Sequence, residues 1–206
     1  MKASGRSSTG IGIGNGSSVG KNLPKNSNLT TQPPSSAKEN DMLNKIQIVK
    51  NPNGDTRTAQ KDVSFEDFSR ANDMHINDVK SVVRELAARL NESAAKHDYT
   101  KKTHERIFYR DFLATMNDGA DFVNGEWYKL HIHEERHHPL SYCHKDINLL
   151  DIIEMCVDCT VAGLARSGSV RPMEVSTEIL QLALDNTSKL IQSMCNVVET
   201  QDKEAK

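Results

Sequence analysis

The chain lacks any hydrophobic run long enough to cross a membrane or to direct secretion. No window approaches the roughly 18 consecutive apolar residues of a membrane span, and the first 30 residues contain no apolar segment of signal-peptide length. These absences argue against membrane proteins and exported proteins. We therefore expect a soluble protein of the cytoplasm that makes no use of a membrane.

Cysteine is scarce, with 4 residues in a chain of 206. Cys143, Cys156, Cys159 and Cys195 have none of the close, repeated spacing of a disulfide framework, so we expect reduced thiols. Cys156 and Cys159 form a CxxC, but they lie inside one continuous helical pattern and no second pair stands at zinc-ribbon spacing. We interpret them as small residues of the hydrophobic core.

Sustained strand alternation is also missing, whereas apolar residues recur at helical spacing beyond residue 60. The clearest stripe comprises Val79, Val82, Val83, Leu86, Leu90 and Ala94. Ser64 and Asp73 stand where helix N-caps are expected, so we predict a short helix after Ser64 and a long one over 74–95. Further helices are predicted over 103–117, 126–137, 147–165 and 174–199. The fold class is thus all-α, a bundle of about five to six helices.

Residues 1–60 differ from the rest of the chain. They are rich in Gly, Ser and Asn and carry 8 Lys or Arg against 3 Asp or Glu, whereas residues 61–206 carry 18 against 25. Too few large apolar residues are present to offset the entropy of ordering. We expect a long, basic N-terminal arm over 1–60, disordered or extended, followed by a helical domain over 61–170 and a C-terminal amphipathic helix and tail over 171–206.

The arm also contains "GNGSSVGKN", which is similar to a phosphate-binding P-loop. Asn15 stands where that motif needs its first glycine, and Asn22 stands where it needs a magnesium-binding hydroxyl. No strand pattern precedes the segment. We therefore interpret it as a linker.

Histidine is concentrated in "HIHEERHHP", residues 131–139. His133, Glu134 and His137 match HExxH, in which a zinc-peptidase helix places two imidazoles one turn apart beside a catalytic glutamate. Glu154 and Asp158 even have the spacing of a third-ligand helix. Against this interpretation, Glu135 and Arg136 would put two charges where such a helix packs, and no strand pattern precedes the motif. A zinc metallopeptidase therefore remains the minor alternative.

A second interpretation combines His75, the adjacent pair His97 and Asp98, and Asp158. This order in a helical chain resembles the HD-domain phosphohydrolases, whose four corresponding side chains hold a divalent metal inside a helical bundle. "HDYTK" adds Lys101 at the position of the lysine that meets substrate phosphate in the HD phosphodiesterases. Mixed imidazole and carboxylate ligands suit Mn, Fe, Ni or Zn.

The resemblance implies further histidines for a second ion between the HD pair and the final aspartate, and His131 with His137 or His138 fall there. "HIND", "HDYTK", "RHHP" and "EMCVDC" together resemble an uncharacterised HD-like family common in phages and bacteria, over about residues 74–166. The resemblance implies one or two ions, a metal-activated water, and a phosphomonoester or phosphodiester substrate such as a nucleotide. Asp98 and Lys101 are the implied catalytic residues, and for a phage protein the location would be the host cytoplasm or the virion.

The predicted helix over 147–165 supports a shared site. Asp151, Glu154, Met155 and Asp158 lie along one stripe of an otherwise apolar segment, because residues three and four apart share a helix face. Buried carboxylates need a partner, and either a metal or a pairing side chain such as Arg106 or Arg166 would supply it.

A rival function is that of a phage structural or interaction protein that binds its partners through the arm over 1–60. The stripe of Val175, Ile179, Leu182, Leu190, Ile191, Met194 and Val198 also offers a surface for a homo-oligomer through 174–199. Metal content separates these hypotheses, because only the hydrolase requires a bound ion.

Overall fold

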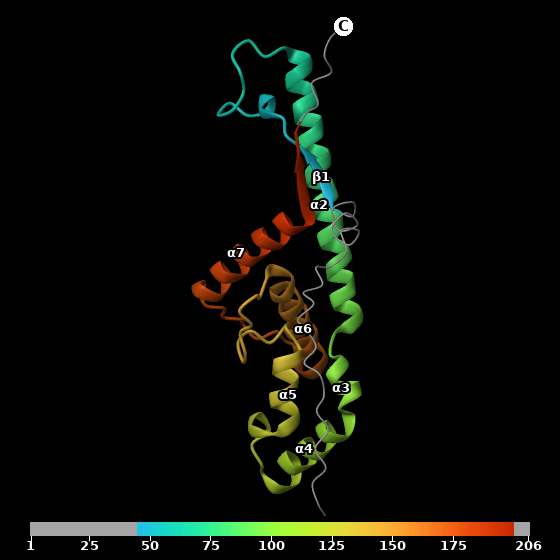
Figure 1. Ribbon diagram of the computed structural model, residues 1–206. Coiled ribbons are helices and arrows are strands. Elements are labelled where there is room, and N and C mark those ends of the chain that lie inside the picture. Colours follow the sequence, from blue (N-terminus) through green and yellow to red (C-terminus); the bar gives the residue numbers. More distant parts are fainter. Residues whose placement is uncertain (1–44, 200–206) are drawn as a thin grey trace, which may run out of the picture.

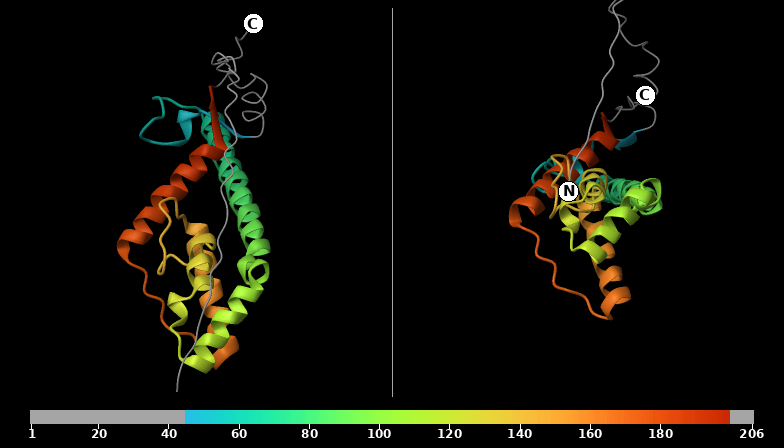
Figure 2. Two further views of the ribbon diagram at one scale, coloured as in Figure 1. Left: turned by 60° about the horizontal axis from the view of Figure 1, so that its bottom comes forward. Right: turned by 90° about the horizontal axis from the view of Figure 1, so that it is seen from below.

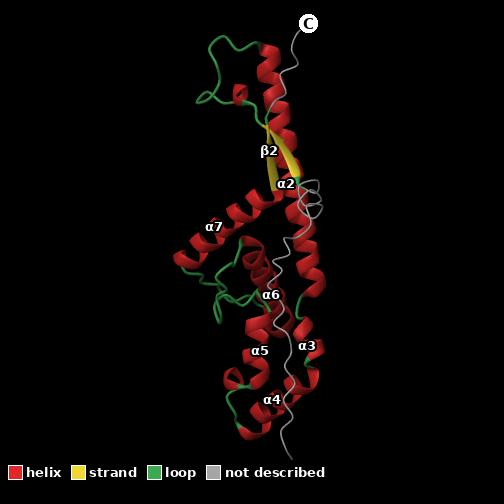
Figure 3. Ribbon diagram, viewed as in Figure 1, coloured by secondary structure: helices red, strands yellow, loops and turns green. Residues whose placement is uncertain are grey.

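The computed structural model describes residues 45–199, and most of them are helical (Figure 3). One long helix, α2 (Phe65–Lys96), runs from one end of an elongated molecule to beyond its middle (Figure 1). The remaining helices lie along its C-terminal half and beyond its end. The expected all-α fold class is thus confirmed for the described part of the chain.

Helix α2 replaces the two helices predicted on either side of Asp73. Ser64 caps its N-terminus, with its hydroxyl oxygen accepting from the Asp67 backbone N–H at 3.1 Å. No Gly or Pro occurs between Phe65 and Lys96, so nothing in the sequence interrupts the backbone hydrogen bonds at Asp73. The prediction of a helix start at Asp73 was wrong, because a residue suited to capping also tolerates an exposed position inside a helix.

The chain then turns through three shorter helices, α3 (Tyr99–Thr103), α4 (Glu105–Asp118) and α5 (Glu126–Glu134), with the 3-10 turn η2 (Phe122–Asn124) before α5. Gly119, at a φ of 68°, ends α4 in the left-handed conformation that favours glycine. Helix α5 is shorter than predicted, so 135–137 belong to the loop that connects it to α6.

The hydrophobic core lies between α6 (Leu149–Ser167) and α7 (Thr177–Met194). Ile147, Ile152, Met155 and Ala183 are buried together, and Val175, Ile179 and Leu182 pack against them. Part of the stripe predicted to support a homo-oligomer is therefore used within the chain. Leu180 and Leu184 of α7 stay exposed. Cys156 packs against this core and Cys159 is exposed, both as free thiols.

Two short strands were not predicted. β1 (Ile46–Val49) pairs in parallel with β2 (Cys195–Val198), with Ile46 opposite Cys195. Strands of four residues are too short to show alternation, and β2 continues directly from α7 where we expected more helix. Residues 45–60 of the predicted arm thus form β1 and the 3-10 turn η1 (Pro52–Gly54). The rest of the arm lies outside the described residues.

The two further views show that α5 and α6 lie between α2 on one side and α7 on the other (Figure 2). No described helix is both long and apolar enough to cross a membrane.

Candidate metal centre

The site is built at the break between α2 and α3. His97 leaves helical geometry with a ψ of 128°, and Asp98 follows at a φ of 58°, in the left-handed region. Asp and Asn are the non-glycine residues that adopt this conformation most readily. The break turns the chain so that both side chains face α5 and α6, which an unbroken helix would not do because neighbouring residues point about 100° apart.

Four further ligand candidates come from three other segments. His131 is buried in the last turn of α5, His137 and His138 follow in the loop to α6, and Asp158 lies on α6. Their side chains meet those of His97 and Asp98, so six of the seven predicted metal ligands converge.

His75 is the seventh, and it does not join them. It is exposed on α2, 22 residues before His97. At about 1.5 Å per residue the two lie roughly 33 Å apart along the helix axis. The helix predicted over 74–95 already placed His75 in its first turn and His97 just beyond its end, so the length of the helix itself keeps the two residues apart.

One group of donor atoms surrounds Oδ1 of Asp98. His131 Nε2 lies 3.6 Å and His137 Nε2 lies 3.8 Å from it. His138 Nε2 is 2.8 Å from His131 Nε2. One ligand atom from each of these four residues falls within 4.8 Å of the others.

A second group uses the other oxygen of the same carboxylate. His97 Nε2 lies 3.2 Å from Asp98 Oδ2 and 3.6 Å from Asp158 Oδ1. Ligand atoms bound about 2.1 Å from one ion are roughly 3.0 to 3.5 Å apart. Both groups approach this spacing, so each could hold a metal ion, and Asp98 contributes an oxygen to both.

Glu154 fixes the orientation of two of these imidazoles. Its Oε1 lies 2.9 Å from His97 Nδ1 and 3.1 Å from His137 Nδ1, and its Oε2 accepts from the Ser93 hydroxyl. A carboxylate can only accept, so each Nδ1 carries a proton, and in the neutral imidazole each Nε2 then keeps its lone pair toward Asp98. A carboxylate that orients a histidine in this way is typical of metal sites.

Thr100 does the same for His131. Its hydroxyl donates to the buried Glu135 carboxylate at 2.7 Å, and its oxygen lies 2.6 Å from His131 Nδ1. The hydroxyl proton is committed to Glu135, so His131 Nδ1 must donate and its Nε2 is again left with a lone pair. Three imidazoles thus present their Nε2 atoms to one small region.

Two buried atoms in that region have no hydrogen-bond partner among the described residues, namely Asp98 Oδ1 and His137 Nε2. Leaving such atoms unpaired costs on the order of 1 to 3 kcal/mol each. They face each other at 3.8 Å, too far for a hydrogen bond. A cation between them would satisfy both, so the residues present fit a metal ion.

Burial keeps two of the imidazoles neutral. Burial lowers the pKa of His131 to about 3 and that of His138 to about 4, helped by neighbouring imidazoles. The Trp127 ring stacks on His131 with centroids 4.4 Å apart and excludes water from it. Burial opposes the charged form of Glu154, but hydrogen bonds from His137, Ser93 and His97 outweigh it and lower its pKa to about 2. At neutral pH His131 and His138 are therefore free to bind a cation.

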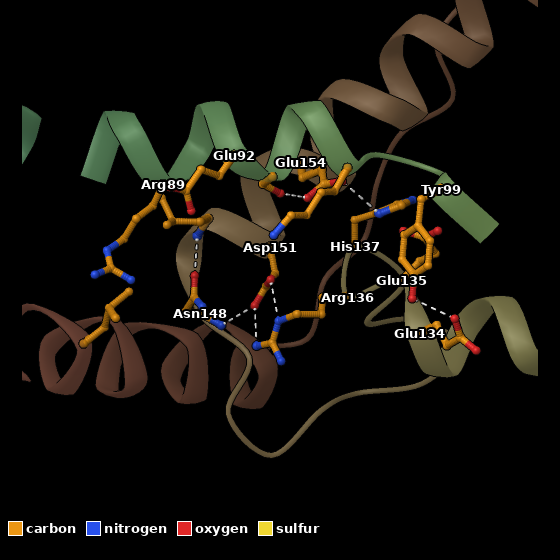
Figure 4. Close-up of a pocket in the computed structure, with 14 residues that line it drawn as sticks. Arg89, Glu92, Tyr99, Glu134, Glu135, Arg136, His137, Asn148, Asp151 and Glu154 are labelled. Carbon is orange, nitrogen blue, oxygen red and sulfur yellow. Dashed lines mark hydrogen bonds and ion pairs between the residues drawn. The ribbon is translucent and has the colours of Figure 1, made fainter. Parts of the chain in front are cut away.

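The two basic side chains near the site have different surroundings. Lys101 Nζ pairs with Asp98, and burial of Asp98 is outweighed by this contact, so the pKa of the carboxyl is lowered. Arg136 instead forms two bonds of 2.9 Å to Asp151 (Figure 4). A third bond, of 3.0 Å, joins it to the Asp146 carboxylate. Lys101 is thus the cation placed at the candidate ligands, whereas Arg136 braces the loop before α6.

The HExxH interpretation does not fit this geometry. His133 is exposed and its ring contacts Tyr142, while α5 ends at Glu134, so His133 and His137 do not share a helical turn. Glu134 accepts from the Tyr99 hydroxyl at 2.7 Å. His104 and His144 also lie outside the candidate ligand groups found among the described residues.

Comparison with known protein families places the chain. Residues 64–203 match the model of a family of unknown function (DUF5662). The chain belongs to this family. The match extends from the cap of α2 beyond β2, so every candidate ligand lies within the part that defines a DUF5662 protein. No curated protein and no solved structure matches.

Three residues of this DUF5662 site were not predicted in their present roles. Glu154 was noted as part of a polar stripe and at the spacing of a third-ligand helix, whereas Thr100 and Glu135 were given no role in orienting a ligand. Their importance lies in hydrogen bonds between residues 31 to 57 positions apart, such as Thr100 to His131 and His97 to Glu154. The sequence offered one signal, for Glu154 alone: it lies four positions before Asp158, on the same face of an apolar helix.

Proposed function

We propose that the protein is a divalent-metal-dependent hydrolase of phosphomonoesters or phosphodiesters. The observation that supports this most is the pair of buried, unpartnered atoms, Asp98 Oδ1 and His137 Nε2, at the centre of six imidazole and carboxylate donors. Such a mixed donor set favours Mn, Fe, Ni or Zn over Mg or Ca, which prefer oxygen ligands alone.

Asp98 Oδ1, His131, His137 and His138 would hold one ion. His97, Asp98 Oδ2 and Asp158 would hold the other. When bound, such a pair of ions supplies Lewis acidity toward a phosphoryl oxygen and lowers the pKa of a coordinated water. Two adjacent ions are typical of phosphoester hydrolysis, and this favours the phosphohydrolase over other metal chemistry.

The chain's own residues would complete the site. Glu154 and Thr100 hold three imidazoles with their Nε2 lone pairs facing inward, and the Trp127 ring keeps water from one side of His131. Lys101 is close enough to Asp98 to pair with it, so its ammonium group is in position to neutralise charge on a phosphoryl oxygen.

The order His97, Asp98, Lys101 and Asp158 supports an HD-type enzyme. The departure is the first histidine of that pattern, since His75 lies far from the other ligands. The proposed centre therefore takes its remaining imidazoles from His131, His137 and His138.

The test uses the purified full-length protein with Mn²⁺, Fe²⁺, Ni²⁺ or Zn²⁺ and two generic substrates, 4-nitrophenyl phosphate and bis(4-nitrophenyl) phosphate. We expect release of nitrophenolate with at least one ion. Asp98→Asn should reduce it by more than about 100-fold, beyond the effect of losing one outer hydrogen bond. Asparagine tolerates the left-handed backbone at this position.

The matched control is His133→Asn, which removes an exposed imidazole of the same histidine-rich segment and should leave the rate unchanged. Hydrolysis that survives in Asp98→Asn, or no hydrolysis of either substrate with any of the four ions, would contradict the proposal.

A further inference from the structure

An apolar groove runs beside the candidate metal centre, between α2 and α6. Its volume is about 440 Å³, within the range of small-molecule sites. Leu90 and Ala94 of α2 form one wall, and Ile153, Val157 and Val161 of α6 form the other. The three α6 side chains are 43%, 57% and 58% exposed, which is unusual for such a row of aliphatic groups.

The same groove is lined by His97, Glu154 and Asp158. On α6, Glu154 directly follows Ile153, and Asp158 directly follows Val157. Successive residues of a helix point about 100° apart, so an acidic stripe runs beside an aliphatic stripe. His97 Nε2 and Asp158 Oδ1, 3.6 Å apart, therefore border the apolar surface directly. An occupant of the groove would touch both.

The lining indicates the chemistry of that occupant. None of the residues described as lining the groove is Phe, Tyr or Trp, and none is Lys or Arg; Asn91 is the one neutral polar side chain. A nucleobase would find no aromatic side chain of that kind to stack on and few groups to bond its edge. By contrast, the cavity of about 330 Å³ on the other side of Glu154 is lined by Arg89, Lys96 and Arg136 (Figure 4).

We propose that this groove binds the aliphatic chain of a phosphoester whose phosphoryl group lies at His97 and Asp158. This inference rests on the proposed phosphohydrolase function and specifies its substrate class, an alkyl phosphate. Each buried methylene should improve binding by roughly fourfold until the chain outgrows the groove.

The experiment compares ethyl, butyl, hexyl and octyl phosphate as substrates of the metal-loaded full-length protein, with phosphate release as the readout. A second readout is calorimetric binding of methylphosphonate and octylphosphonate, which are not hydrolysed. We expect kcat/KM to rise with chain length and octylphosphonate to bind at least ten times more tightly than methylphosphonate.

Val157→Asn places an amide in the groove at a position exposed enough to accept it. It should remove most of the chain-length dependence, so that kcat/KM falls much more with octyl phosphate than with ethyl phosphate. The matched control is Val79→Asn, a similarly exposed valine of α2 away from the groove, at 48% exposure. Circular dichroism checks that both variants fold.

Hydrolysis and binding that do not depend on chain length would overturn the groove assignment while leaving the hydrolase intact. So would a nucleoside monophosphate that outcompetes octyl phosphate, or sedimentation showing that the parent protein is a dimer and that Val157→Asn converts it to a monomer. A third outcome separates the two proposals. Octylphosphonate would still bind more tightly than methylphosphonate, and Val157→Asn would abolish the difference, but no ester would be hydrolysed. In that case the groove assignment holds and the proposed hydrolase function is wrong.

Discussion

Helix α6 takes part in two buried polar clusters that differ in one respect. At its first turn, Asp151 receives two bonds from Arg136 and one of 2.8 Å from the Asn148 backbone N–H, so its carboxylate is fully paired. One and two turns later, Glu154 and Asp158 face the imidazoles, where Asp98 Oδ1 and His137 Nε2 lack partners. The first cluster is complete in itself and serves the fold, whereas the second is complete only with an added cation.

The largest effect on stability should come from breaking the complete cluster. Arg136→Met preserves the length of the side chain but leaves the Asp151 carboxylate buried, at 8% exposure, without its charge partner. We expect the free energy of unfolding of the metal-free protein to fall by about 3 kcal/mol. Urea denaturation measures this, and Arg89→Met, which breaks the exposed ion pair with Glu85, should cost less than about 1 kcal/mol.

The folded fraction of Arg136→Met should still bind metal with the stoichiometry of the parent. A variant as stable as the parent that binds no metal would mean that the roles of the two clusters had been exchanged.

The next largest effect should come from Thr100→Val, which keeps the side-chain shape but removes the hydroxyl between Glu135 and His131. His131 Nδ1 then loses its acceptor, so the imidazole is free to protonate Nε2, the atom that must bind the ion. We expect the dissociation constant for Mn²⁺ to rise about 10- to 100-fold. Calorimetric titration measures it, and Thr103→Val on the same short helix serves as the control.

A smaller effect should come from Asp111→Asn, because the Asp111 carboxylate binds a backbone N–H at the N-terminus of α5, the helix that carries His131. Asp111 accepts from the Trp127 backbone N–H at 2.8 Å, and this bond lowers the pKa of the carboxyl. A lowered folded-state pKa adds stability above the unfolded value of about 3.9 and loses it as the pH falls below that value. Asp111→Asn should therefore cost about 1 kcal/mol at pH 7.

The difference between Asp111→Asn and the parent should shrink when unfolding is measured near pH 3. Asp118→Asn, at the exposed C-terminal end of α4, provides the comparison at both pH values. A difference that grows as the pH falls would reverse the sign of this argument.

The smallest effects should come from His75→Ala and His133→Ala. Both side chains are exposed and outside the candidate ligand groups. We expect each to change stability by less than about 0.5 kcal/mol and to leave metal binding unaltered. Loss of a bound ion in His75→Ala would contradict this prediction. It would make His75 a metal ligand, as the resemblance to the HD-domain phosphohydrolases implies.

Sequence reasoning reached the helical fold and the convergence of His97, Asp98 and Asp158, because residue types with metal chemistry stood in a recognisable order. It failed at His75, because the order of the motifs placed that residue in the site although the helix predicted over 74–95 already separates it from His97 by roughly 33 Å. The turn that brings His97 and Asp98 to the other ligands depends on tertiary contacts, which local propensity does not predict.

The roles of Glu154 and Thr100 were equally out of reach, because a hydrogen bond between distant segments leaves no spacing pattern. The same holds for β1 and β2, four-residue strands whose partners lie 149 positions apart. Spacing identified the residues able to bind a metal, and packing decided which of them face one another.

Anomalous X-ray diffraction from crystals of the Mn²⁺-loaded protein tests the central claim most directly. The account predicts an ion about 2.1 to 2.3 Å from both Asp98 Oδ1 and His137 Nε2, with a second ion beside His97 and Asp158. Density that leaves these two atoms facing each other without an ion, in crystals grown at saturating Mn²⁺, would contradict it.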